Sequence, residues 1–352
     1  MIDVLIVDDS ALMRRFLTQI FEEAGGYTLR TARNGEAALA QMSQCMPDVV
    51  TLDINMPEMD GLTCLSHIMV RHPCPVIMVS SLTEKGALAT LEALELGAVD
   101  YLTKPGGTVS HNIAQVKDEL LSKVQAAVSS RPRQADRSAN RRGTVAARAP
   151  VSRDMSAQPA AEGLVLVGVS TGGPSALETL LGDLPADLKW PLVVTQHMPA
   201  TFTSVLAERL DGLCDLHVVE VGRPTPLQRG HVYLARGDRD LEIRMRGGKL
   251  TAVPVPASDD FAWHPSADRM VASALEVLGS RSLIGVLLTG MGDDGAETMA
   301  RLHDQGGKTI AESEETTVVY GMPRALVERS GASEVLPLEQ IAGRLKRWLH
   351  SI

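Results

Sequence analysis

A repeated unit, in which a short apolar strand ends at polar residues and a helical pattern follows, constrains the fold more than any other feature of this sequence. Strands that alternate with helices pair in parallel, so the chain is predicted to be α/β, with two doubly wound parallel sheets. A hairpin that turns at Gly247-Gly248 and a closing helix over residues 338–349 are also expected. The expected strands span residues 4–7, 28–32, 49–54, 76–80 and 99–103 in the first half, and 164–169, 191–197 and 282–289 in the second.

The two halves are separated by a segment of different composition. With 352 residues the chain is long enough for two domains. Between about residues 129 and 162 the apolar periodicity gives way to Ser, Ala, Pro and Arg, with seven arginines against two aspartates over residues 131–154. We therefore expect domains at residues 1–125 and 163–352, joined by a flexible linker at 126–162. A nucleic-acid-binding arm is the alternative, but no aromatic residue is interleaved and no recognition helix follows.

Composition and charge narrow the class of protein. A hydrophobic content of 44% with 22% charged residues is typical of a globular protein. The sequence contains no run of about 18 apolar residues, so no membrane-spanning segment is predicted. The first residues lack the basic segment of a signal peptide, so we expect a cytoplasmic protein. Four cysteines at unrelated spacings predict neither disulfides nor a zinc site. The net charge of -9 argues against a general nucleic-acid binder.

Polar residues end four strands of the first half. These are Asp8 and Asp9, then Asp53, Ser80 and Lys104. Because the carboxyl ends of parallel strands meet in one crevice, we expect these side chains to lie close together. A divalent cation such as Mg²⁺ would relieve the repulsion among three carboxylates and leave one of them able to attack phosphate. Lys104 and Ser80 would then bind phosphoryl oxygens.

Three motifs carry a resemblance to response-regulator receiver domains that covers essentially all of residues 1–125. The resemblance implies a flavodoxin-like domain that a histidine kinase phosphorylates on Asp53. It also implies Mg²⁺ held by Asp8, Asp9 and Asp53, and by the backbone carbonyl of Asn55. The motifs are Val-Asp-Asp-Ser at 7–10, Leu-Asp-Ile-Asn-Met-Pro at 52–57 and Leu-Thr-Lys-Pro at 102–105.

A glycine-rich corner opens the second half. Residues 168–172 read Gly-Val-Ser-Thr-Gly, which matches the G-x-S-x-G pattern of a nucleophile elbow. A strand that turns sharply into a helix lifts the hydroxyl of Ser170 and points backbone N–H groups at the same space. A strand, glycines and a helix N-terminus also form phosphate cradles, as in nucleotide-binding modules. The motif alone leaves both interpretations open.

The next two strand ends supply the partners that a serine nucleophile needs. A serine hydroxyl is unreactive at neutral pH unless a neighbouring base takes its proton, and that base works best when a carboxylate fixes its tautomer. His197 is the favoured base because it ends a strand, as Ser170 does. Asp293 and Asp294 follow the third strand, in a Ser, His, Asp order that differs from that of α/β-hydrolases. A nucleotide-binding module would instead require an acidic residue where His197 stands.

Five motifs of the second half resemble the catalytic domain of CheB, the family of chemotaxis receptor methylesterases. The resemblance implies that Ser170 is the nucleophile, His197 the base and Asp294 the acid, with Asp293 as the neighbouring alternative. Backbone N–H groups of Thr171 and Met291 would form the oxyanion site, and no cofactor is expected in this domain. The motifs lie at residues 169–174, 196–199, 264–268, 288–296 and 320–323.

Together the two resemblances imply a phosphorylation-activated chemotaxis response regulator used for adaptation. Its expected reactions are hydrolysis of glutamate γ-methyl esters on chemoreceptors, with release of methanol, and deamidation of receptor glutamines. The expected partners are methyl-accepting chemotaxis receptors and a chemotaxis histidine kinase, with no nucleic acid. One hypothesis for regulation is that the unphosphorylated receiver docks over the sheet edge that carries Ser170.

Overall fold

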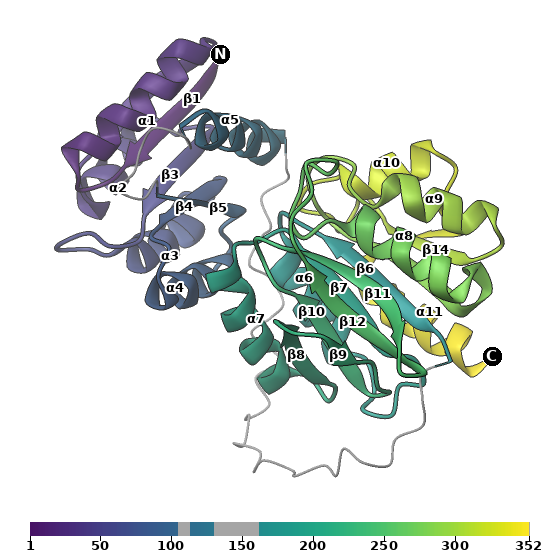
Figure 1. Ribbon diagram of the computed structural model, residues 1–352. Helices are drawn as coiled ribbons and strands as arrows, with labels where there is room; N and C mark the ends of the chain where they lie inside the picture. Colours follow the sequence, from purple (N-terminus) through teal and green to yellow (C-terminus); the bar gives the residue numbers. More distant parts are fainter. Residues whose placement is uncertain (105–112, 130–161, 352) are drawn as a thin grey trace. The chain divides into compact units, whose positions relative to one another are not determined.

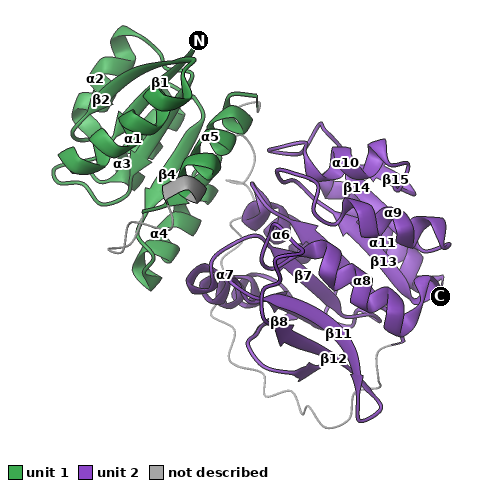
Figure 2. Cartoon of the chain, turned by 45° about the horizontal axis from the view of Figure 1, so that its top comes forward, with its two compact units in different colours: residues 1–152 green, residues 153–352 purple. Residues whose placement is uncertain are grey.

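The computed structural model describes residues 1–104, 113–129 and 162–351, and it divides into two compact units, Met1–Ser152 and Arg153–Ile352 (Figure 2). Each unit has its own sheet and its own buried core. Within the described residues, no helix combines the length and the apolar character that crossing a bilayer requires.

The first unit is a five-stranded parallel sheet in the order β2-β1-β3-β4-β5, with helices on both faces (Figure 1). The central strands β3 and β4 are buried at every residue, including the polar Thr51 and Asp53 of β3. Helices α2, α3 and α4 pack one against the next, while Lys117 of α5 pairs with Glu23 of α1. The elements are β1 (Ile2–Val7), α1 (Ala11–Ala24), β2 (Tyr27–Ala32), α2 (Gly35–Gln44), β3 (Val49–Asp53), α3 (Gly61–Arg71), β4 (Val76–Ser80), α4 (Glu84–Glu95), β5 (Asp100–Thr103) and α5 (Ile113–Ser129).

Helix α5 continues four residues beyond residue 125, where we expected the receiver to end. Val124 and Ala127 are both fully buried, so its apolar face still packs on the unit at that point. The remainder of the expected linker, apart from Glu162, lies outside the described residues.

The second unit is built on a seven-stranded parallel sheet in the order β15-β14-β13-β6-β7-β10-β8. Helices α8, α9 and α10 pack one against the next, and α6 packs between α7 and α11. The elements of this sheet and its helices are β6 (Leu164–Val169), α6 (Gly173–Gly182), β7 (Leu192–Gln196), α7 (Ala200–Leu213), β8 (His217–Val221), β10 (His231–Ala235), α8 (Ala267–Leu278), β13 (Leu283–Leu287), α9 (Ala296–Asp304), β14 (Lys308–Glu312), α10 (Met322–Glu328), β15 (Glu334–Leu336) and α11 (Leu338–His350).

A small antiparallel sheet lies beside helix α8 of the second unit. It consists of β9 (Thr225–Pro226), β11 (Asp240–Arg246) and β12 (Lys249–Val255), in the order β11-β12-β9. Strands β11 and β12 form the expected hairpin, and both Gly247 and Gly248 adopt positive φ at its turn. The first strand of the hairpin, β11, packs against α8, so this sheet supports that helix.

Strand β6 is the point at which the order of the large sheet reverses. The chain passes from β6 to β7 on one side, and later returns to β13 on the other side of β6. In open α/β sheets a crevice forms at the carboxyl ends of the strands at such a switch point. The two doubly wound parallel sheets are therefore confirmed, and the residues that follow β6, β7 and β13 share one edge.

Candidate active site

Ser170 lies at the corner between β6 and α6, in a turn that only glycine can complete. Gly172 has φ +77°, and a Cβ atom there would lie 2.5 Å from Val318 Cγ2. A side chain at Gly173 would collide with Gln196 Oε1. The serine itself is held through its backbone, because its N–H donates to the Thr289 carbonyl at 3.0 Å. The glycines thus produce the sharp corner that exposes the Ser170 side chain.

His197 lies opposite Ser170 across two neighbouring strands. In the parallel register of β6 and β7, Val169 pairs with Gln196, so the next residue on each strand is Ser170 and His197. The His197 N–H also donates to the Val169 carbonyl at 3.2 Å. Neighbouring strands run about 4.8 Å apart, which brings the two side chains to the same point of the sheet edge.

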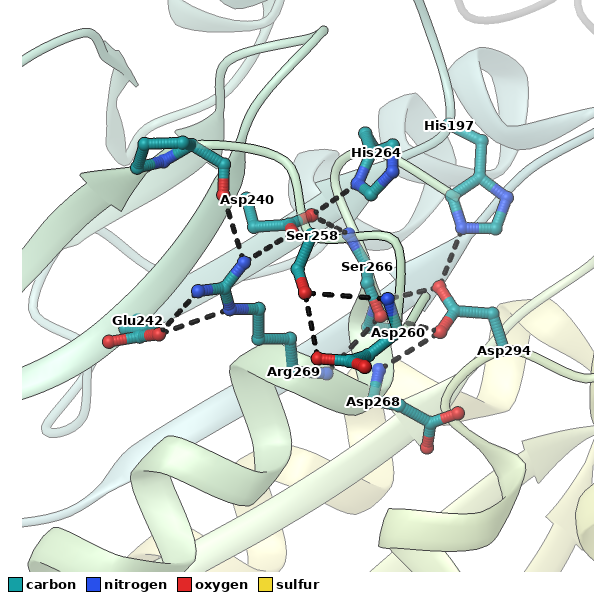
Figure 3. Close-up of polar contacts among 12 residues, drawn as sticks. His197, Asp240, Glu242, Ser258, Asp260, His264, Ser266, Asp268, Arg269 and Asp294 are labelled. Carbon is teal, nitrogen blue, oxygen red and sulfur yellow. Dashed lines mark hydrogen bonds and ion pairs between the residues drawn. The ribbon is translucent and has the colours of Figure 1, made fainter. Parts of the chain in front are cut away.

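The imidazole of His197 is fixed by a carboxylate and by an aromatic ring. Its Nε2 lies 2.7 Å from Asp294 Oδ2 (Figure 3), and its other nitrogen, Nδ1, is buried without a hydrogen-bond partner in the described part of the chain. The indole of Trp263 stacks on the ring, with centroids 5.0 Å apart and planes inclined by only 4°. With Nε2 engaged, Nδ1 is the ring nitrogen free to accept a proton.

Asp294 is a buried carboxylate that receives four hydrogen bonds. Besides His197, its donors are the Ser266 hydroxyl at 2.9 Å and the N–H groups of Ala267 at 2.6 Å and Asp268 at 3.0 Å, at the start of α8 (Figure 3). Burial raises the pKa of Asp294, but the contact with His197 and the backbone N–H groups outweigh it and hold the pKa below its ordinary value. The group is therefore an ionised partner for the imidazole.

Asp293, the alternative acid, has a different environment. Its carboxylate is exposed and lies 2.9 Å from the Arg329 guanidinium, at the surface. Of the two adjacent aspartates, the structure brings only Asp294 to the imidazole of His197.

The two N–H groups expected to bind an oxyanion belong to firmly anchored peptide groups. The Ser170 carbonyl accepts from Gly173 N at 2.8 Å and Gln196 Nε2 at 3.0 Å, so the Thr171 N–H of the same planar peptide points the opposite way. The Gly290 carbonyl likewise accepts from the backbone N–H groups of residues 321 and 322, which turns the N–H of Met291 away from them.

These two peptide groups approach each other closely. A Cβ atom at Gly290 would lie 2.7 Å from Ser170 Cβ, so the turn after β13 packs directly on the serine. The structure therefore places both expected donors beside Ser170, with orientations set by backbone contacts.

The first unit gathers its strand-end residues as a second cluster. Oxygen atoms of Asp8, Asp9 and Asp53 all lie within 4.8 Å of one another. Lys104 Nζ lies 2.9 Å from Asp53 Oδ2 and 3.0 Å from Asp8 Oδ2. Burial raises the pKa of Asp53, although Lys104 opposes that rise. The Ser80 hydroxyl is buried beside them and donates to the Gly86 carbonyl at 3.2 Å.

Asn55 is held in the same cluster by its backbone. Its N–H lies 3.3 Å from Asp53 Oδ1, which fixes the loop that follows β3 over the carboxylate. Three convergent carboxylates with a lysine match the hard oxygen ligands and the counter-charge of a magnesium and phosphate site.

Sequence reasoning missed the segment that supports Asp294. Trp263 and Ser266 lie in a stretch without periodicity, between β12 and α8. Asp240 anchors this stretch, because its fully buried carboxylate accepts from His264 Nδ1 at 3.0 Å and Ser266 N at 3.0 Å, and pairs with Arg269 at 2.7 Å (Figure 3). The only available signal was the His-Pro-Ser-Ala-Asp motif, which does not reveal these contacts.

Comparison with known proteins assigns each unit to a protein family. The family model described as CheB methylesterase matches residues 165–345, and the response regulator receiver domain matches residues 4–111. A protein of Rhodospirillum rubrum named protein-glutamate methylesterase/protein-glutamine glutaminase 3 is 52% identical over 357 residues, which cover 99% of this chain and 96% of that protein. A protein-glutamate methylesterase/protein-glutamine glutaminase 2 of Rhodopseudomonas palustris is 49% identical, covering 99% and 98%.

A solved structure supports the assignment of the second unit. The crystal structure of the Thermotoga maritima CheB methylesterase catalytic domain matches with a TM-score of 0.51 and 36% identity, and the match covers 54% of this chain and 98% of that one. From the family models and the full-length relatives, the chain belongs to the CheB methylesterase family, with a response regulator receiver domain at its amino-terminal end.

Proposed function

We propose that the second unit hydrolyses glutamate γ-methyl esters on chemoreceptors and deamidates receptor glutamines, with Ser170 as nucleophile, His197 as base and Asp294 as acid. The observation that carries the proposal is the pairing of the His197 imidazole with a buried carboxylate, directly opposite Ser170 in the strand register. The names of the full-length relatives agree with this pair of activities.

The first chemical step forms an acyl-enzyme. His197 Nδ1 takes the proton of the Ser170 hydroxyl while Oγ attacks the γ-carbonyl carbon of the substrate. The carbonyl oxygen becomes an oxyanion, which the N–H groups of Thr171 and Met291 stabilise. The imidazolium then donates its proton to the leaving group, so that methanol departs from an ester, or ammonia from an amide.

The second step releases the enzyme. A water molecule gives a proton to His197 and attacks the acyl carbon. As the oxyanion collapses, the imidazolium of His197 returns that proton to Ser170 Oγ, and free glutamate is released. Asp294 keeps the proton of the neutral ring on Nε2, so Nδ1 is an acceptor at the start of each step. Its negative charge also stabilises the imidazolium that forms each time.

The receiver is proposed to take a phosphoryl group on Asp53. Asp8, Asp9 and Asp53 fit a Mg²⁺ ion, since each offers an oxygen within 4.8 Å of the others, and the carbonyl of Asn55 would complete the protein ligands. The ion would supply charge neutralisation for the incoming phosphate. Lys104 would move its ammonium group from the carboxylates to a phosphoryl oxygen, and Ser80 would donate to another.

The partners and the location follow from these two activities. The proposed phosphodonor is a chemotaxis histidine kinase, and the proposed substrates are methyl-accepting chemotaxis receptors. We expect neither nucleic-acid binding nor membrane insertion, and we expect the protein to act in the cytoplasm. Docking of the unphosphorylated receiver over the Ser170 edge remains our hypothesis for how phosphorylation activates the esterase.

One experiment tests the proposal. Methanol release from methylated receptor membranes is measured for the wild type and for Ser170→Ala, with and without a small-molecule phosphodonor. We expect release by the wild type, stimulation by the phosphodonor, and loss of release in the variant under both conditions. Release that survives the substitution would exclude Ser170 as the nucleophile.

A further inference from the structure

The stack between Trp263 and His197 is the contact of the active site that has no role in the steps above. The centroids lie 5.0 Å apart and the planes are inclined by 4°, so the face of the indole covers the face of the imidazole. This is an offset parallel stack within the range that stabilises aromatic pairs. The hydrogen bond to Asp294 holds one edge of the ring, whereas Trp263 covers one of its faces.

Trp263 is held in place from both sides. After it in the sequence, the buried carboxylate of Asp240 binds His264 and Ser266, which fixes the backbone that follows the indole. Near the indole itself, a Cβ atom at Gly292 would lie 3.4 Å from Trp263 Cζ2, an ordinary van der Waals contact, so the turn after β13 lies directly against the ring. The indole is therefore preorganised on the imidazole.

The chemistry of the proposed reaction makes the identity of that neighbour important. Each time Ser170 or water loses a proton, the imidazole becomes a cation. An aromatic face attracts a cation through its quadrupole, and a tryptophan face does so best. A neutral imidazole gains much less from the same contact, so the indole stabilises the charged state selectively.

We propose that Trp263 is a positioning residue that stabilises the imidazolium of His197 and holds the ring in line with Ser170. The inference rests on the proposed function of His197 as the base. Asp294 contacts Nε2 of the ring, and the carboxylate of Asp268 accepts a hydrogen bond from Thr298 Oγ1 at 2.7 Å. His264, the residue after Trp263, is titratable as well, and its Nδ1 lies 3.0 Å from the buried carboxylate of Asp240. The exposed Asp293 is paired with Arg329 instead.

The proposal predicts how activity changes when the aromatic face is removed. In Trp263→Leu, which keeps an apolar side chain, kcat/KM should fall by about 2- to 30-fold, the range of one cation–π contact. Since the imidazolium is then less stabilised, the ring loses its proton at lower pH, and the acid limb of the kcat/KM profile should move to lower pH. Trp263→Phe retains an aromatic face and should recover most of the loss.

A spectroscopic readout tests the stack without any turnover. A protonated imidazole in contact with an indole quenches its fluorescence, and the chain has only three tryptophans. The full-length protein is titrated between about pH 5 and 9, together with Trp263→Phe, His197→Gln and Trp348→Phe. Trp348 is the matched control, because its ring contacts the ammonium group of Lys308, 5.1 Å from the ring centroid, and not an imidazole.

The outcomes separate the inference from the proposed function. We expect quenching on acidification in the wild type and in Trp348→Phe, and its loss in both Trp263→Phe and His197→Gln. If quenching is absent from the wild type, or survives in Trp263→Phe or His197→Gln, the inferred contact between the two rings is refuted. A Trp263→Leu enzyme with wild-type kcat/KM and pH profile overturns its role in the reaction. Activity that survives in Ser170→Ala contradicts the proposed function, while the titration still reports on the stack.

Discussion

Replacement of Asp294 by Asn exchanges one carboxylate oxygen for an NH₂ group at a site where every neighbour is a donor. Oδ1 accepts from Ser266 Oγ and Asp268 N, and Oδ2 accepts from Ala267 N and His197 Nε2. Whichever position the NH₂ group takes, it faces one backbone N–H that then lacks an acceptor. That unpaired group should lower the free energy of unfolding by about 1–3 kcal/mol.

The effect on activity depends on which oxygen is replaced. If the amide oxygen still faces His197, the tautomer is kept and only a charge-assisted hydrogen bond is weakened, worth about 1.5–3 kcal/mol or roughly 10- to 150-fold in rate. If the NH₂ group faces His197, Nε2 must accept, the proton moves to Nδ1, and Nδ1 no longer accepts from Ser170. The loss should then approach roughly 10⁴-fold, as in serine proteases with the equivalent substitution.

The assay is methanol release from methylated receptor membranes, combined with urea unfolding of the same preparations. Asp293→Asn is the matched control, because its exposed pair with Arg329 contributes little. We expect that control to stay within about twofold of the wild type. The reasoning fails if Asp294→Asn retains more than about a third of wild-type activity, or if both substitutions reduce it equally.

Four further predictions have defined outcomes. Asp53→Asn should abolish stimulation by a phosphodonor while unstimulated methanol release continues, and equal stimulation of both proteins would exclude Asp53 as the acceptor. Mg²⁺ should raise the melting temperature of the wild type more than that of Asp53→Asn, because the substitution removes one of three carboxylates. The pKa of Asp294 is lower in the folded protein than in the unfolded chain, so the ionised carboxylate stabilises the fold. This contribution is complete above the ordinary pKa of 3.8 and is lost as the pH falls through the lowered value. In urea unfolding, the stability of the wild type should therefore converge on that of Asp294→Asn in acid. Gly290→Ala places a methyl group 2.7 Å from Ser170 Cβ, and should reduce both stability, by about 1–3 kcal/mol, and methanol release; an unchanged melting curve would contradict the close approach.

The strand ends could be predicted from the sequence because the same physical rule applies to each of them. A strand buried on both faces is mostly apolar, and the polar residues that follow its carboxyl end lie at the sheet edge, which identified Ser170, His197 and the Asp293-Asp294 pair. The rule also located the carboxylates of the receiver. It carries no information about register, so the alignment of Ser170 with His197 had to come from the structure.

The contacts of the 263–269 segment could not be predicted. Two adjacent aspartates look equivalent in sequence, and they differ only because the start of α8 presents its N–H groups to Asp294, while Asp293 turns to Arg329. Trp263 follows no periodic pattern, and its partner lies 66 positions earlier in the numbering (263 minus 197). Such contacts depend on how distant segments meet, which local patterns do not encode.

The attachment of Asp294 to helix α8 has a practical consequence for capturing a receptor complex. An inactive variant made by substituting Asp294 would also loosen the amino-terminal end of that helix. A failure to capture receptor could then reflect either the altered active site or the altered helix. Ser170 is secured through its main chain, by Thr289, Gly173 and Gln196, so Ser170→Ala removes the reactive oxygen and leaves the surrounding scaffold tethered. Ser170→Ala is therefore the better inactive variant with which to capture a complex with methylated receptor.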